Sequence, residues 1–428
     1  MSRLFSLSGG ALVVVLATAL AACSESKDLV NPPPPVSPLF ASYVSLGNSL
    51  TAGYQSGGIS DSTQQLAYPV LIARQMGTPF TIPALRDPGC PPPIANFLTG
   101  ERVSVPQGLT DQCSFRADIA GKVVINNVAV PGANSVDPTS FDGSGANALT
   151  TLILGGETQV QRALDANPTF ISAWIGNNDV LAAALSGILV PVAGISPGVT
   201  PVATFATNYA AMISGLQAGT SLKGGVLIGV IQVAGAPEFF PAALLVNDPR
   251  YKAMFDAAVG APVTIHPSCT PTTKSLISFA IVAQMRAWLA DPNPDPAQRA
   301  GVPPVLLCEK NQPGFPAPLG DIFVLDAGEQ AALATTIDSY NAIIDSTANA
   351  LGWAYADLNP TIAQLRSDTT VVPAFPHLDQ PTKPYGDYVS LDGVHPAAAG
   401  QRLIADSLVS VINAKYGTAI PIRPSARR

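Results

Sequence analysis

The sequence contains few charged residues and few histidines. Both shortages limit the classes of function that the protein can have. Only 12% of its 428 residues are charged, the net charge is −7, and no cluster of Lys or Arg is present. We therefore expect no nucleic-acid partner. The histidines are His266, His377 and His395, so chemistry that needs an imidazole has three candidates. The length and the 47% hydrophobic content suffice for one large domain with insertions, or for two domains.

Several motifs are also missing. No Cys-x-x-Cys or His-x-x-x-His spacing occurs, and no glycine-rich phosphate loop or nicotinamide fingerprint is evident. We therefore predict that the protein needs no metal and no organic cofactor. The apolar run Ala11–Leu20 is too short to span a membrane.

The N-terminus resembles a bacterial lipoprotein signal. A positively charged start and the apolar run lead to small residues and then to Cys23. This pattern predicts cleavage of residues 1–22 and lipidation of Cys23, and an ordinary secretory signal is the alternative. Ser24 favours outer-membrane sorting in a cell with two membranes. The Pro-rich linker 23–39 would then hold the domain away from the membrane.

Four cysteines remain once Cys23 is set aside. An even number in an exported chain favours disulfides over a metal site, and three pairings are possible. Sequence proximity favours Cys90 with Cys113 and Cys269 with Cys308.

Strand-like and helix-like stretches alternate along the chain. Strands are expected at 42–46, 122–130, 169–175, 225–233 and 353–358, and helices at 66–76, 159–166, 204–217, 276–289, 329–351 and 397–413. This alternation predicts an α/β fold whose parallel sheet of about five strands is covered by helices on both faces. The domain would span 40–416, with a tail at 417–428 and insertions at about 84–120, 180–202 and 234–325.

Four short segments, three of them directly after expected strands, carry the polar groups of an acyl-transfer site. They are Gly47-Asn48-Ser49-Leu50, Pro131-Gly132-Ala133-Asn134, Gly176-Asn177-Asn178-Asp179 and Asp392-Gly393-Val394-His395. A serine hydroxyl attacks an ester only when a base takes its proton. Among the three histidines, only His395 has a carboxylate three residues before it, so Asp392 could orient its ring. The alternatives are a surface Asp–His pair that caps a helix and residues that serve only in turns.

Together and in this order, the four segments resemble the blocks of the SGNH hydrolases, also called the GDSL esterase/lipase family. The resemblance covers about 43–408 without the insertions and implies a flavodoxin-like, three-layer α/β/α fold. It makes Ser49 the nucleophile, His395 the base and Asp392 the group that orients the base.

The resemblance also assigns three oxyanion donors, namely the backbone N–H groups of Ser49 and Gly132 and the side-chain amide of Asn178. Asn48 departs from the family's aspartate. The departure leaves the triad intact but changes the surroundings of the nucleophile.

The implied activity is hydrolysis of a carboxylic ester through an acyl-enzyme, by a monomer at the bacterial cell envelope. Lipid esters, acetylated glycans and small esters are all compatible, and the apolar insertions favour acyl chains. An acyltransferase with the same residues and a non-catalytic binding lipoprotein are the alternatives. The insertions, in particular 180–200 and 262–318, have two interpretations. They form either a lid or acyl groove over the site, or a disulfide-linked surface insertion that enlarges the core.

Two other features of the sequence do not indicate a functional site. Gly194-Ile195-Ser196-Pro197-Gly198 matches the nucleophile elbow of α/β-hydrolases, but Pro197 lacks the N–H that this elbow uses. We expect Trp174 and Trp288 to be core or cap residues rather than binding platforms.

Overall fold

The computed structural model describes residues 37–103, 123–140, 148–187, 189, 198–290, 305–308 and 323–422. The predicted signal peptide with Cys23, most of the linker, and also Cys113 and Ser196 lie outside these ranges. No helix within them is long and apolar enough to cross a membrane.

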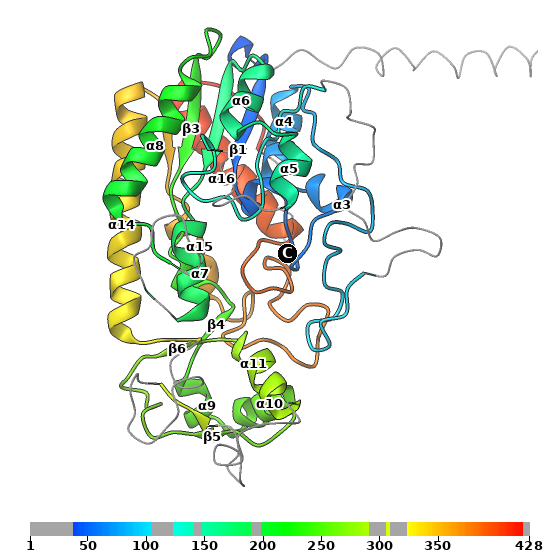
Figure 1. Cartoon of the computed structure of the whole chain (residues 1–428), viewed down its shortest axis with the longest axis vertical. Helices are drawn as coiled ribbons and strands as arrows, with labels where there is room; N and C mark the ends of the chain where they lie inside the picture. The colour runs from blue at the N-terminus through cyan, green and yellow to red at the C-terminus, as the bar shows by residue number, and fades with distance from the viewer. Residues whose placement is uncertain are drawn as a thin grey trace, which may run out of the picture.

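A parallel four-stranded sheet forms the centre of the molecule (Figure 1). Its strands, in spatial order, are β1 (Tyr43–Gly47), β2 (Phe170–Trp174), β3 (Gly224–Ile228) and β9 (Ala354–Ala356). The register pairs Tyr43 with Phe170 and Phe170 with Gly224. The predicted α/β fold with a parallel sheet is therefore confirmed.

The strand expected at 122–130 is reduced to an extended edge segment with one bridge, between Asn127 and Ser45. The Ser45 N–H donates to the Asn126 carbonyl at 2.8 Å, and the Val128 N–H donates to the Ser45 carbonyl at 2.9 Å. The Val130 N–H donates to the Gly47 carbonyl at 3.1 Å, whereas the Ala129 N–H donates to the Asn127 side chain at 3.2 Å. Counted as a strand, the segment gives the order 2-1-3-4-5, as in flavodoxin-like sheets.

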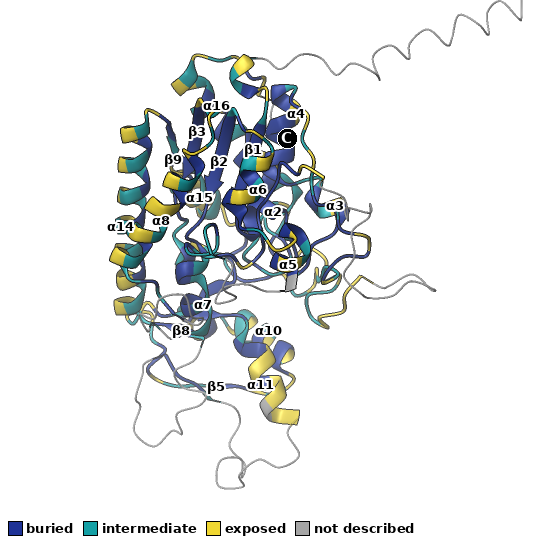
Figure 2. Ribbon diagram, turned by 45° about the horizontal axis from the view of Figure 1, so that its top comes forward, coloured by how far each residue is buried: buried dark blue, intermediate teal, exposed yellow. Residues whose placement is uncertain are grey.

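Helices cover both faces of the sheet, as expected. One face carries α4 (Tyr68–Met76) and α16 (Ala398–Tyr416), and the other carries α6 (Gln159–Asp165), α8 (Val202–Leu216) and α14 (Ala327–Leu351). Smaller elements of this domain are η2 (Pro38–Phe40), α2 (Ser49–Ala52), α3 (Asp61–Gln64), α5 (Ala148–Leu154), α7 (Asn178–Ser186) and α15 (Asn359–Ser367). Figure 2 shows the strands buried between helices whose outer faces are exposed.

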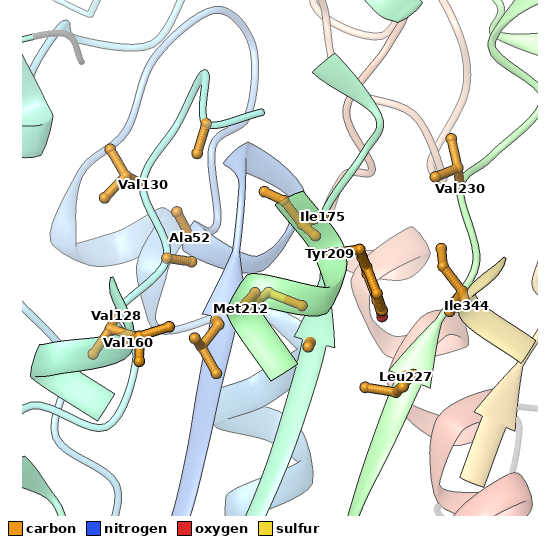
Figure 3. Packing of buried hydrophobic residues seen from close by; sticks show 14 of the residues in the cluster. Ala52, Val128, Val130, Val160, Ile175, Tyr209, Met212, Leu227, Val230 and Ile344 are labelled. Atoms are coloured by element: carbon orange, nitrogen blue, oxygen red, sulfur yellow. The ribbon is translucent and has the colours of Figure 1, made fainter. Parts of the chain in front are cut away.

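Alternation along the strands sends side chains to two separate cores. Val44, Ile171 and Leu227 pack toward α6, α8 and α14, where Tyr209 and Met212 meet them (Figure 3). The alternate strand residues, which include Tyr43, Phe170 and Val226, pack toward α4 and α16 on the other face. Fully buried parallel strands with apolar side chains on both faces are typical of this architecture.

The insertion 234–325 builds a third core beyond the sheet, at the end where α7 begins (Figure 1). Its elements are η3 (Val233–Gly235), β4 (Phe239–Pro241), α9 (Ala243–Asn247), α10 (Pro249–Val259), β5 (Thr264–Ile265), β6 (Leu276–Ser278), α11 (Ile281–Ala290), β7 (Val305–Leu306) and β8 (Val324–Leu325). Cys269 and Cys308 form a disulfide with an S–S distance of 2.03 Å, the pairing that sequence proximity favours.

The single helix expected at 276–289 is wrong at its start. Leu276–Ser278 is a strand, because it pairs antiparallel with both β4 and β8, and the helix begins only at Ile281. Ile277 and Met285 are buried in the core of the insertion. This segment is therefore part of a packed unit, and its deletion would remove that core.

Candidate active site

The end of β1 presents Ser49 at the carboxyl edge of the sheet. Gly47 has a φ of +154°, and a Cβ atom there would lie 2.5 Å from the Trp174 carbonyl oxygen and from the Thr51 hydroxyl. Only glycine therefore allows the chain to turn from β1 into α2 so close to β2. Ser49 is the first residue of α2 and is 7% exposed.

Asn48 caps this short helix. Its side-chain oxygen accepts the Leu50 N–H at 3.1 Å, and its carbonyl accepts the Thr51 N–H at 3.1 Å. The hydrogen bonds of the described residues include none that the Ser49 N–H donates. The cap thus leaves this N–H available for a ligand.

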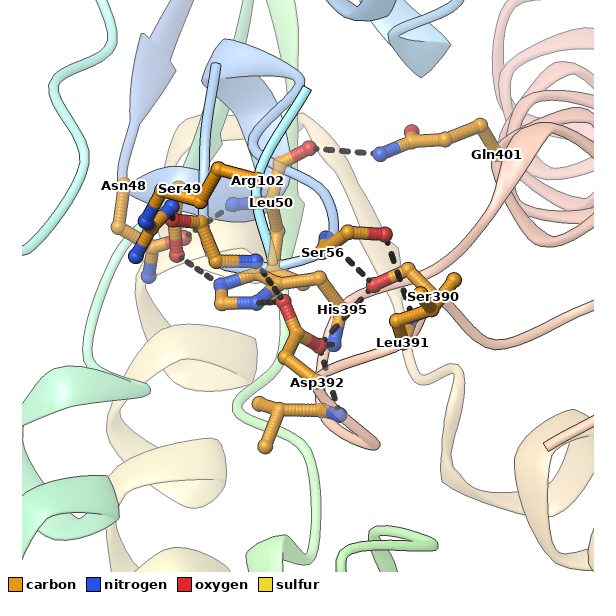
Figure 4. Close-up of polar contacts among 12 residues, drawn as sticks. Asn48, Ser49, Leu50, Ser56, Arg102, Ser390, Leu391, Asp392, His395 and Gln401 are labelled. Atoms are coloured by element: carbon orange, nitrogen blue, oxygen red, sulfur yellow. Dashed lines mark hydrogen bonds and ion pairs between the residues drawn. The ribbon is translucent and has the colours of Figure 1, made fainter. Parts of the chain in front are cut away.

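Ser49, His395 and Asp392 form one chain of hydrogen bonds (Figure 4). The Ser49 Oγ lies 2.8 Å from His395 Nε2, and His395 Nδ1 lies 2.9 Å from Asp392 Oδ2. The His395 and Asp392 side chains are 12% and 16% exposed. A carboxylate on Nδ1 fixes the tautomer that leaves Nε2 free to take the serine proton.

Asp392 is held by donors from several directions. Its Oδ1 accepts the N–H groups of Val394 at 3.0 Å and His395 at 2.8 Å, and the Ser390 hydroxyl at 3.0 Å. Its Oδ2 also accepts the Gly57 N–H at 2.8 Å. Burial alone would raise the pKa of this carboxyl, but the charge of His395 and these hydrogen bonds hold the pKa well below its usual value.

A loop after α2 supports the Asp–His pair, and sequence reasoning did not identify it. Ser56 donates its N–H to the Ser390 Oγ at 2.9 Å, and its hydroxyl accepts the Leu391 N–H at 3.2 Å. The ring of Tyr54 lies 5.0 Å from that of His395. Ser56 has a φ of +54°, and no local pattern marks it in the sequence.

The candidate oxyanion residues lie on adjoining segments, Gly132 on a loop and Asn178 at the start of α7. Gly132 has a φ of +86°, and its N–H donates no hydrogen bond among the described residues. Asn178 begins α7, and its Nδ2 donates to the Ala133 carbonyl at 2.8 Å, which leaves the second hydrogen of that amide. The side chain of Asn178 thus ties α7 to the Gly132 loop.

Asp179 of α7 adds a second tie between this helix and the loop after Gly132. It accepts the Ser135 N–H at 2.8 Å and the Ser135 hydroxyl at 2.6 Å. Burial raises the pKa of this carboxyl to about 6, and the hydrogen bonds from Ser135 oppose the rise. The sequence motif contained Asp179, but sequence reasoning gave it no role.

The other candidates have ordinary surroundings. His266 is hydrogen-bonded to Ser268 within its own loop, and His377 is exposed. Trp174 is fully buried, as expected, and donates to the Gly229 carbonyl at 2.9 Å. Within the described residues, no group of three or more His, Cys, Asp or Glu could hold a metal ion.

A cavity of about 690 Å³ lies over α10 and α11. Leu98, Tyr251, Met254, Arg286 and Phe375 are among its lining residues, whereas Ser49, Asp392 and His395 are not.

The fold and the site define an α/β protein with a Ser–His–Asp chain at the carboxyl ends of its parallel strands, beside the point where the strand order reverses. No family model matches the sequence, and no curated protein matches it. Among solved structures, a catalytic mutant of Axe2, an acetylxylan esterase from Geobacillus stearothermophilus, is similar at a TM-score of 0.36 and 10% identity, over 86% of this chain and 93% of that one. An extracellular lipase from Streptomyces rimosus is similar at a TM-score of 0.30 and 15% identity, over 87% of this chain and 98% of that one.

Proposed function

We propose that the protein is a serine ester hydrolase of the SGNH type. The observation that carries the proposal is the pair of hydrogen bonds that joins Ser49 to His395 and His395 to Asp392, although Ser49 and His395 are 346 residues apart. A scaffold or binding protein does not need a buried hydroxyl, imidazole and carboxylate aligned in this order.

The reaction follows from these positions. Ser49 Oγ attacks the ester carbonyl while its proton passes to His395 Nε2, and Asp392 stabilises the imidazolium. The tetrahedral oxyanion would accept hydrogen bonds from the Ser49 N–H, the Gly132 N–H and the free hydrogen of Asn178 Nδ2. The alcohol leaves with the proton from Nε2, and water then releases the acid by the same steps.

We also propose a substrate class and a cellular location. The apolar insertion favours an ester with an acyl chain, and acetylated glycans and small esters are the other classes. The lipoprotein-like start and the Cys269–Cys308 disulfide support an exported protein, anchored to the bacterial envelope through Cys23.

The test is hydrolysis of p-nitrophenyl esters from acetate to palmitate by the domain without its anchor. Wild type should turn over at least one ester, and Ser49→Ala should lower kcat by several orders of magnitude. Ser62→Ala, which changes an exposed serine of α3, is the matched control and should keep full activity. A folded wild type without turnover contradicts the proposal, and transfer of the acyl group to an added alcohol or sugar would indicate an acyltransferase.

A further inference from the structure

A second buried carboxyl lies behind the Asp392–His395 turn. The Glu238 N–H donates to the Gly393 carbonyl at 2.9 Å, and the Glu238 carbonyl accepts the Phe279 N–H at 3.0 Å. Glu238 therefore connects the insertion directly to the turn that carries the Asp–His pair.

The turn packs closely on this residue. Gly393 has a φ of +70°, and a Cβ atom there would lie 2.9 Å from the Glu238 nitrogen and 2.8 Å from Cζ of Tyr385. Movement of the Glu238 backbone would therefore move Gly393, which directly follows Asp392 in the turn.

Among the described residues, the Glu238 side chain faces three hydrogen-bond donors and no cation. Its Oε1 accepts the Ala280 N–H at 2.8 Å and the Ser278 hydroxyl at 3.0 Å, and its Oε2 accepts the Tyr385 hydroxyl at 3.3 Å. The residue is 7% exposed, and no Lys, Arg or His of the described chain pairs with it. These donors all favour the carboxylate form, although an unpaired buried charge is costly.

The charged and titratable groups around Glu238 are few. Burial and the charge of Asp392 together raise the pKa of Glu238 to about 7, against the hydrogen bonds from Ser278, Ala280 and Tyr385, which favour the carboxylate. Arg366 of α15 acts on Tyr385 rather than on the carboxyl itself. The β6–α11 segment contributes only the neutral donors of Ser278 and Ala280. The Glu238 carboxyl thus lies in the field of Asp392, with its pKa raised toward neutrality.

We propose that Glu238 is a positioning residue for the Asp392–His395 pair. Its backbone N–H holds the Gly393 turn, and its carboxylate places a second negative charge within the field of Asp392. That charge stabilises the protonated imidazole of His395 in the transition state. The inference rests on the proposed function for its catalytic meaning, but the electrostatic coupling exists whether or not an ester is turned over.

The test is an NMR titration of His395 in protein labelled with ¹³C-histidine, which is feasible because the chain has three histidines. Glu238→Gln keeps acceptors for Ser278 and Ala280 and can donate to Tyr385, so it removes the charge with little change of shape. The His395 midpoint should move to lower pH by about half a unit to one unit. The ascending limb of kcat/KM should move with it, and the plateau should fall several-fold.

Two further variants keep the test decisive. Tyr385→Phe removes one donor to the carboxylate, so it should move the His395 midpoint in the same direction by a smaller amount. Glu329→Gln is the control, because this carboxylate accepts the Asp326 N–H in the capping box of α14. It should leave the midpoint unchanged.

The outcomes separate the two proposals. Folded Glu238→Gln and Tyr385→Phe proteins with the wild-type His395 midpoint would overturn the role of Glu238, even if their thermal stability were lower. If Glu238→Gln does not fold, Tyr385→Phe decides. A wild type that hydrolyses no ester contradicts the proposed function, whereas the titration still reports the coupling.

Discussion

The backbone N–H of Gly57 and the Nδ1 of His395 both lie within hydrogen-bond distance of one oxygen, Oδ2 of Asp392, at 2.8 and 2.9 Å. The loop after the nucleophile thus shares the carboxylate with the base. Because two segments 335 residues apart in sequence meet at this oxygen, the charge of Asp392 has both an orienting and a structural role.

We expect Asp392→Asn to lower kcat by about a thousand- to ten-thousandfold with a small effect on KM. The amide lacks the charge that stabilises the imidazolium, and it does not fix the reactive tautomer. Ester hydrolysis at saturating substrate measures the loss. Asp387→Asn, which changes an exposed carboxylate paired with Lys383 at 2.6 Å, should keep wild-type turnover. An Asp392→Asn protein within tenfold of wild type would contradict the assigned role.

Asp392 and Asp179 predict opposite dependences of stability on pH. The pKa of Asp392 lies below its unfolded value near 3.8, so its contribution is present above pH 4 and is lost as the pH falls. The pKa of Asp179 is raised to about 6, so its ionisation destabilises the fold as the pH rises from 4 to 6, by about 3 kcal/mol in full.

Urea unfolding between pH 3 and 7 checks both signs. The stability difference between wild type and Asp392→Asn should shrink toward pH 3. Asp179→Asn should flatten the profile between pH 4 and 6, whereas Asp165→Asn, at an exposed position, should not. An unchanged profile in Asp179→Asn would show that its carboxyl titrates normally.

Asn178→Ala should lower kcat by about a hundred- to a thousandfold, because one oxyanion donor is lost. The matched control is Asn208→Ala, since Asn208 donates to the Ser135 hydroxyl at 3.0 Å in the same network but has no place in the oxyanion hole. Steady-state kinetics on one ester, with KM and kcat separated, compares the two. Equal losses in both variants would mean that Asn178 acts only through the loop.

Asn48→Ala should lower the free energy of unfolding by about 1 to 2 kcal/mol, because α2 loses the acceptor for the Leu50 N–H. Asn48→Asp keeps that acceptor and restores the residue that the SGNH resemblance leads one to expect. Denaturant unfolding of both variants separates the cap from the side-chain charge. If Asn48→Ala and Asn48→Asp destabilise the protein equally, the hydrogen bond to the Leu50 N–H does not account for the stabilising effect of Asn48.

Reduction of the Cys269–Cys308 disulfide should destabilise the insertion by about 4 kcal/mol, from the entropy of a loop that spans 39 residues. Hydrogen exchange should show lost protection in α10 and α11 while β1 to β3 keep theirs. The Cys269→Ser/Cys308→Ser double variant should behave like the reduced protein. Uniform loss of protection across the sheet would show that the insertion and the sheet unfold as one unit.

The parts of the site that the sequence predicted share one property: each belongs to a short segment with its own pattern. Ser49 follows a strand, and Asp392 precedes His395 by three residues, so both assignments needed only local spacing. Glu238, Ser56 and Ser390 have no such pattern, because their roles come from contacts across more than 100 residues of chain.

The two errors in the fold have a similar cause. The segment expected as a strand at 122–130 keeps backbone hydrogen bonds to β1 where the structure describes it, but asparagine side chains also bond the neighbouring backbone, and it forms one bridge rather than a regular strand. The segment at 276–278 begins the apolar stretch expected to be a helix, but it pairs with β4 and β8 as a strand. In both places tertiary contacts decided between structures that the local sequence allowed.

The separation of 346 positions between the serine and its base in the sequence also determines when the site can form. During synthesis the nascent chain carries a hydroxyl without a proton acceptor until the segment around His395 has emerged from the ribosome. Contacts of such long range close slowly, since much of the chain must be ordered before they form. Activity should therefore appear last in refolding, after the sheet, and a chain truncated before the Asp392 turn should be inert however well its strands assemble.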